Sequence, residues 1–135
     1  MRYLGIDYGE KKLGLALSDG ILASPYSLRS KIKDPLFARK LAQSKQSKIQ
    51  EICQKEKVGI IIIGISEGTM ANKTRNFAEE LKKITGLPVV YQDETLTSQE
   101  AVKKMIEAGK KKKYRQEKQH HIAACIILQN YLDSH

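Results

Sequence analysis

The sequence predicts an α/β protein built on a mixed five-stranded sheet, with three antiparallel and two parallel strands and with helices on both faces. Three strand-like segments fill the first 28 residues, and their connections are so short that neighbouring strands must be antiparallel. Residues 58–64 are a continuous, mostly β-branched run, which is typical of a strand buried on both faces. Helical patterns precede this strand and the next one, so both are reached by crossover connections.

The first three strands are expected at residues 2–8, 12–18 and 21–28. The dipeptide Asp19-Gly20 is a turn signal between the second and the third. Pro25 cannot donate a backbone hydrogen bond, which places the third strand at an edge of the sheet.

Two helices and two strands follow in alternation. Asp34-Pro35 supplies an N-cap and a first-turn proline for a helix reaching Cys53, although its middle is polar. A helical stripe from Thr74 to Ile84 ends at Gly86 and leads into a strand over residues 87–91.

The last part of the chain is predicted to be helical on both sides of a basic loop. Thr97-Ser98-Gln99-Glu100 matches a capping box and begins a helix that ends at Gly109. A final helix is expected from about Gln119 to Leu132, after the basic loop.

Length and composition favour one cytoplasmic domain over residues 1–135. No apolar run approaches the roughly 20 residues of a membrane helix, and the start has no signal-peptide pattern. We therefore expect no membrane partner. Cys53 and Cys125 are distant in sequence and are interpreted as reduced core thiols.

The charge indicates a polyanionic partner. The formal net charge is +9, and residues 103–118 hold eight basic and two acidic side chains. Such an excess favours nucleic acid, although a solvated loop is the simpler interpretation of a charge run. The candidate phosphate contacts are Lys73 and Arg75, in the first turns of a helix, and Lys110, Lys111, Lys112, Lys113 and Arg115.

The candidate catalytic residues are acidic and follow predicted strands. Asp7 shares a strand face with Gly5 and Gly9, so a ligand could approach the main chain there; alternatively, Asp7 caps the strand end. Asp93 and Glu94 follow the fifth strand, and the carboxyl ends of parallel strands meet at one edge. Gathered carboxylates suit a hard divalent ion such as Mg²⁺, whereas the simpler role for Asp93-Glu94 is to cap the next helix.

Four segments in order resemble the YqgF-like family: LGIDYGEKKLGLALSD, GISEGTMANKTRNFAEEL, QDETLTSQEA and AACIILQNYL. Members are described as Holliday junction resolvases and as nucleases that process pre-16S ribosomal RNA. The resemblance implies an RNase H-like fold, a Mg²⁺ or Mn²⁺ cofactor, and hydrolysis of phosphodiester bonds in structured nucleic acid. It assigns metal binding to Asp7 and Glu94, with Asp93 adjacent.

One departure from the family pattern bears on activity. The position before the last helix's Ala123-Ala124 that holds an acidic third ligand in the family is His120 here, and Glu117 lies about one helical turn earlier. An imidazole suits Mn²⁺ better than Mg²⁺. Three functions stay open: processing of the 5′ end of pre-16S rRNA, resolution of Holliday junctions in DNA recombination or repair, and nucleic-acid binding with attenuated catalysis. Both a monomer and a homodimer are compatible with the sequence.

Overall fold

The computed structural model describes residues 1–9, 13–26, 45–66, 68–93 and 112–135, and for residues 69 and 112–120 it describes the backbone alone. The helix predicted at Thr97 and the first part of the helix predicted at Asp34 lie outside these ranges. The strands are β1 (Arg2–Tyr8), β2 (Leu13–Ser18), β3 (Ala23–Pro25), β4 (Val58–Ile65) and β5 (Val89–Asp93). The helices are α2 (Lys45–Glu56), α3 (Thr69–Thr85) and α5 (Lys112–Ser134).

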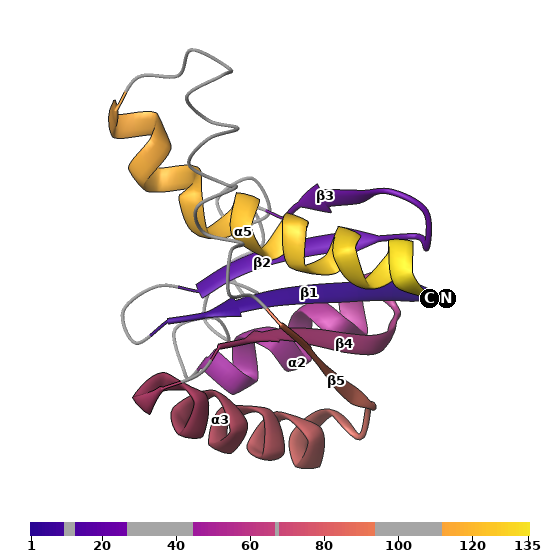
Figure 1. Ribbon diagram of the computed structural model, residues 1–135. Helices are drawn as coiled ribbons and strands as arrows, with labels where there is room; N and C mark the ends of the chain where they lie inside the picture. The colour runs from indigo at the N-terminus through magenta and orange to yellow at the C-terminus, as the bar shows by residue number, and fades with distance from the viewer. Residues whose placement is uncertain (10–12, 27–44, 67, 94–111) are drawn as a thin grey trace, which may run out of the picture.

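The five strands form one sheet in the order β3-β2-β1-β4-β5. β1, β2 and β3 pair antiparallel, whereas β4 lies parallel to both β1 and β5. This arrangement confirms the predicted mixed sheet, with β3 at an edge as Pro25 indicated. Figure 1 shows α5 crossing one face of the sheet, while α2 and α3 lie on the other side.

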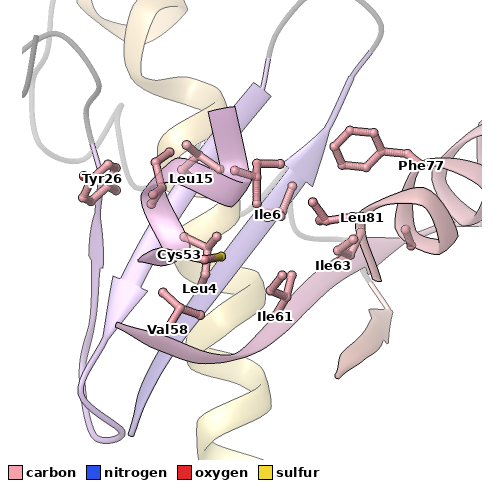
Figure 2. Packing of buried hydrophobic residues seen from close by; sticks show 13 residues of the cluster. Leu4, Ile6, Leu15, Tyr26, Cys53, Val58, Ile61, Ile63, Phe77 and Leu81 are labelled. Atoms are coloured by element: carbon pink, nitrogen blue, oxygen red, sulfur yellow. The ribbon is translucent and has the colours of Figure 1, made fainter. Parts of the chain in front are cut away.

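One face of the sheet packs against α2 and α3. Alternation along β1 and β4 turns Leu4, Ile6, Ile61 and Ile63 to this side, where all four are fully buried (Figure 2). Ile49, Ile52 and Cys53 from α2 and Phe77 and Leu81 from α3 complete the cluster. Burial raises the pKa of the Cys53 thiol to about 12, in agreement with its interpretation as an unreactive core thiol.

The opposite face packs against α5, and Gly5 is the closest point of contact. A Cβ atom at Gly5 would lie 2.7 Å from the Cβ of Leu128 and 2.9 Å from the carbonyl oxygen of Ala124. Ala124 and Leu128 are themselves fully buried. The glycine therefore admits a helix to the strand. The interpretation that a ligand approaches the main chain at Gly5 is wrong, because α5 occupies that space.

Some boundaries differ from the sequence prediction. β3 spans three residues, because the predicted start, Ile21 and Leu22, lies in an exposed turn. In that turn the side-chain amide of Gln129 accepts from the Ala23 N–H and donates to the carbonyl of Ile21, so α5 replaces a strand as the partner. β5 lies two residues later than predicted, and α3 begins at Thr69.

The largest difference is at α5, which begins at Lys112 and not near Gln119. Its first turns are charged and show no apolar stripe, so hydrophobic periodicity could not detect them. Lys112, Lys113 and Arg115 therefore lie on a helix, and the interpretation of residues up to 118 as a loop is wrong. Within the described parts of the chain, no helix is long and apolar enough to cross a membrane.

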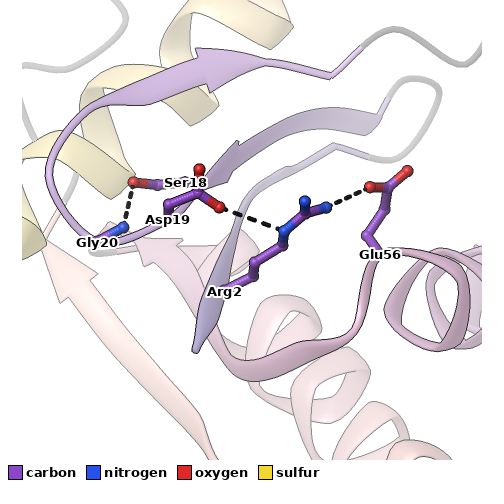
Figure 3. Close-up of polar contacts among 5 residues, drawn as sticks. All are labelled: Arg2, Ser18, Asp19, Gly20 and Glu56. Atoms are coloured by element: carbon purple, nitrogen blue, oxygen red, sulfur yellow. Dashed lines mark hydrogen bonds and ion pairs between the residues drawn. The ribbon is translucent and has the colours of Figure 1, made fainter.

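A polar cluster fixes the start of β1, at the end of the sheet far from Asp7 (Figure 3). The Arg2 guanidinium lies 2.7 Å from a carboxylate oxygen of Glu56, at the end of α2, and 3.3 Å from Asp19. In the turn after β2, the Gly20 N–H donates to the Ser18 hydroxyl, and Gly20 adopts a φ of 124° that favours glycine. These contacts join the turn and α2 to the first strand.

We predict that Gly5→Ala lowers the free energy of unfolding by about 1–3 kcal/mol, because the added methyl group overpacks the contact with α5. Denaturant unfolding measures the loss, and hydrogen exchange should show faster exchange in α5. Gly86→Ala is the matched control: its φ of 70° imposes a backbone cost, but no atom lies within 4 Å of the added Cβ. Unchanged stability and exchange in Gly5→Ala would contradict the packing argument.

Candidate active site

Asp7 is buried near the carboxyl end of the central strand. Its exposed fraction is 8%, and Asp7, Ser18 and Thr74 are the buried polar residues among those described. Because Leu4 and Ile6 face α2 and α3, Asp7 faces the α5 side with Gly5. A carboxylate is costly to bury unless polar partners or a cation compensate it.

Glycines flank Asp7 on both neighbouring strands. Gly14 of β2 pairs directly with Asp7. On the other side Ile6 pairs with Ile63 of β4, which brings Gly64 level with Asp7. Gly64 in turn pairs with Gln92 of β5. The residues level with Asp7 on both adjacent strands are thus glycines without side chains. Gln92 lies two strands away from Asp7, so the spacing between strands puts their Cα atoms roughly 10 Å apart.

α5 runs antiparallel to β1, so its N-terminal half lies toward Asp7. Tyr131 lies near Tyr3 at the start of β1, with ring centroids 6.4 Å apart, whereas His121 contacts Leu15, the partner of Ile6. Ala124 lies against Gly5. Position 120 lies one helical turn before Ala124, and Asp7 lies two residues beyond Gly5. Both steps are roughly 6 Å in the same direction, so position 120 is one turn closer to Asp7 than Ala124 is.

His121 completes the edge of β2. Its Nδ1 accepts a hydrogen bond of 3.2 Å from the Leu15 N–H, while the Leu15 carbonyl accepts from the Tyr26 N–H. An accepting Nδ1 means that the neutral ring carries its proton on Nε2. Since β3 ends at Pro25, the imidazole supplies the acceptor that a longer strand would have offered. His121 is therefore a structural residue, which its place beside His120 in the sequence did not reveal.

Asp93 lies on the other face from Asp7. Along β5, Val89 packs with the α2–α3 side and Val90 with the α5 side, so alternation places Asp93 with Val89. Asp93 also lines a pocket shared with Asn72 and Arg75 of α3. The structure therefore does not bring Asp93 to the face that Asp7 occupies.

Lys73 and Arg75, the two candidate phosphate contacts of α3, are both exposed. Arg75 lines the pocket with Asp93 and, from α3, also acts on Tyr91. Burial and the Glu79 carboxylate raise the pKa of Tyr91, and the positive charge of Arg75 opposes that rise. Lys73 is exposed in the second turn of the same helix.

Lys45 is a further cation at this edge that sequence reasoning missed. Its Nζ donates to the carbonyl of Gly9 at 2.7 Å and lies 5.0 Å from the ring centroid of Tyr8. The Tyr8 ring stacks on Phe77 of α3, with centroids 4.3 Å apart. No local signal could have found this contact, because 36 residues separate Lys45 from Gly9.

The remaining predicted site residues lie outside the described side chains. Glu94, Lys110 and Lys111 fall in an undescribed segment. For Lys112, Lys113, Arg115, Glu117 and His120 the structure gives helical backbone positions only. Among the described side chains, no group of three or more His, Cys, Asp or Glu residues could hold a metal ion.

A family model described as "RuvX: Holliday junction resolvase" matches residues 1–134. The chain belongs to the RuvX family. This confirms the resemblance to the YqgF-like family stated from the sequence. Two similar RuvX-type relatives are each named "Putative pre-16S rRNA nuclease". The one from Agathobacter rectalis is 39% identical over 98% of this chain and 95% of its own length. The one from Syntrophomonas wolfei is 38% identical over 98% and 94%.

Solved structures show that the RuvX-family chain has an RNase H-like fold. Thermus thermophilus RuvC in complex with a Holliday junction substrate matches with a TM-score of 0.55 at 15% identity, covering 99% of this chain and 94% of that one. A second Thermus thermophilus RuvC structure gives a TM-score of 0.56 at 14% identity, covering 99% and 95%. The predicted fold class is confirmed.

Proposed function

We propose that this protein is a divalent-metal-dependent endonuclease that hydrolyses phosphodiester bonds in structured nucleic acid, and that it processes the 5′ end of pre-16S rRNA. The main observation that supports this proposal is the buried carboxylate of Asp7. It lies near the carboxyl end of the central strand, with glycine on both neighbouring strands. The names of the RuvX relatives support the choice of RNA.

The chemistry of Asp7 fits a hard divalent cation, Mg²⁺ or Mn²⁺. A carboxylate oxygen is the ligand that such ions prefer, and the neighbouring glycines leave the space beside it free of their own side chains. Glu94 is proposed as the second ligand. It directly follows β5 in the sequence, and the resemblance to the YqgF-like family assigns it metal binding. When bound, the ion would activate water and stabilise the leaving oxygen.

A third ligand is proposed from α5. Because α5 begins at Lys112, positions 117 and 120 are both helical, and they lie one turn apart on the side that carries Ala124. Position 120 is one turn closer to Asp7 than Ala124 is. We therefore propose Glu117 or His120 as the ligand from α5, and the imidazole would favour Mn²⁺ over Mg²⁺.

We do not assign Asp93 to the metal. Its position on the α3 side separates it from Asp7, so we assign the metal to Asp7 and Glu94 and consider Asp93 a substrate contact beside Arg75. The remaining contacts to the nucleic acid are assigned to Lys73, Arg75, Lys110, Lys111, Lys112, Lys113 and Arg115. Figure 1 shows the backbone of the first turns of α5 extending beyond the sheet, and we propose that the cations of these turns contact a polyanion.

Resolution of Holliday junctions is the second candidate function. The family model carries that description, and a RuvC that shares the fold is seen in complex with a junction. A symmetric four-way junction would favour a homodimer, whereas an RNA end requires only a monomer. If His120 has removed catalysis, salt-sensitive binding without cleavage would remain. In each case the protein would act on nucleic acid in the cytoplasm.

We predict that Asp7→Asn reduces cleavage by roughly a hundredfold or more while leaving the fold and nucleic-acid binding intact, because the neutral amide loses a charged ligand but keeps the shape. Cleavage of pre-16S rRNA fragments and of a four-way DNA junction in Mg²⁺ or Mn²⁺, with and without EDTA, measures the effect. Asp133→Asn, an exposed carboxylate near the end of α5, is the matched control. Full cleavage by Asp7→Asn would remove Asp7 from the mechanism.

We also predict that His120→Asp raises Mg²⁺-supported cleavage by about tenfold, the scale on which changes around a metal site act. A carboxylate supplies the hard oxygen and the negative charge that imidazole lacks. The ratio of Mg²⁺ to Mn²⁺ activity should rise with it, and His135→Asp at the far end of α5 should change neither. If His120→Ala and His120→Asp both leave the metal preference unchanged, Glu117 becomes the α5 ligand.

A further inference from the structure

A pocket lies on the α3 side of the sheet, where β4 and β5 end and α3 begins. Its volume is about 370 Å³, which is at the small end of ligand pockets. Ile65 and Ala71 form the apolar part of its wall. Its polar side chains come from three places: Ser66 after β4, Asn72 and Arg75 on α3, and Asp93 at the end of β5.

We infer that this pocket binds one unpaired guanine nucleotide of the nucleic-acid substrate. The inference rests on the proposed function for its substrate class. It gives the pocket the task of recognising a base, which is separate from the chemistry of the metal site. The pocket combines a small apolar wall, from Ile65 and Ala71, with one cation and one carboxylate among its lining residues.

The carboxylate decides against a simple phosphate site. Asp93 would repel a phosphate group, whereas a neutral base can contact both charged residues at once. The ligand must offer acceptors to the Arg75 guanidinium and N–H donors to the Asp93 carboxylate. An amide at Asn72 and a hydroxyl at Ser66 can each donate or accept, so they fit around such a ligand without fixing its identity.

Guanine is the base that presents this pair of edges. Its O6 and N7 are adjacent acceptors that a guanidinium contacts in bidentate fashion, and its N1–H and N2 amino group are adjacent donors. Adenine, cytosine and uracil do not present two adjacent acceptors on one edge and two adjacent donors on another. Both edges of guanine are free only when the nucleotide is unpaired, as in loops, bulges and ends of structured RNA.

The pocket is close enough to Asp7 for one strand to reach both sites. Asp93 is one residue beyond Gln92, which is two strands from Asp7, so the two Cα positions lie roughly 10 Å apart. A strand that crosses the sheet edge at Gly64 and Ile65 would present one phosphate to the divalent ion proposed at Asp7 and one base to the pocket.

The test is a titration of the full chain with GMP, AMP, CMP and UMP, followed by NMR at the Ala71 and Asn72 amides. GMP should bind in a saturable way and roughly tenfold more tightly than the other three, as a bidentate contact implies. Asp93→Asn and Arg75→Ala should each abolish the preference. The control variants Asp133→Asn and Asp7→Asn should retain it; because Asp7→Asn is expected to lack cleavage, this result also separates the pocket from the nuclease proposal.

Two results would overturn the inference. The first is equal affinity for the four nucleotides. The second is that inorganic phosphate causes the same chemical-shift changes as GMP, which would mean that the pocket binds the phosphate group and not the base. The titration does not depend on cleavage, so selective GMP binding would support the pocket even if the cleavage assays went against the nuclease proposal.

Discussion

The contact between α5 and Gly5 is the constraint on which the rest of the site depends. With Ala124 and Leu128 against a strand position that has no side chain, α5 can lie close to β1 and only at this point along it. That contact sets which helical positions approach the carboxyl end of the strand. His121, Cys125 and Gln129 then bond the edge formed by β2 and the turn before β3, so the helix is fixed along most of its buried length.

Separation of the two sheet faces follows from the same arrangement. The α2–α3 side holds the larger apolar core, and its polar groups at the strand ends are Asp93 and the cations Lys45 and Arg75. The α5 side holds Asp7 in a row with Gly14, Gly64 and Gln92. One edge of the sheet therefore carries two chemically different places, a carboxylate suited to a cation and a pocket suited to a base. A single strand crossing the edge could occupy both.

The sequence predicted the fold well because strand patterns and crossover rules determine this sheet almost completely. The alternation in residues 2–8, the apolar run from Val58 and the turn at Asp19-Gly20 each correspond to an observed element. The start of α5 was missed because a charged helix that extends past the core has no apolar stripe. The start of β3 was predicted too early because Gln129 of α5, far away in the sequence, bonds the residues before it in place of a strand.

For the candidate site, local reasoning predicted that Asp7 lies near the end of the first strand but could not divide the acidic residues between the two faces. Asp93 and Asp7 were grouped because both follow strands at one edge; which face each one takes depends on the register of β1, β4 and β5. Gly5 was interpreted as room for a ligand because a sequence cannot show that a helix more than a hundred residues later fills the space. Lys45 and His121 likewise act through contacts between distant segments.

The central claim is that a divalent ion is held at Asp7 on the α5 side of the sheet. Titration with Mn²⁺, followed by paramagnetic broadening of amide signals, tests it most directly. The account predicts that Asp7, Gly14, Gly64 and Gln92 broaden first, and that the amides of Ala71 and Asn72 broaden only at higher concentration. Broadening centred on the Asp93 pocket, or spread evenly over exposed carboxylates such as Asp133, would contradict it.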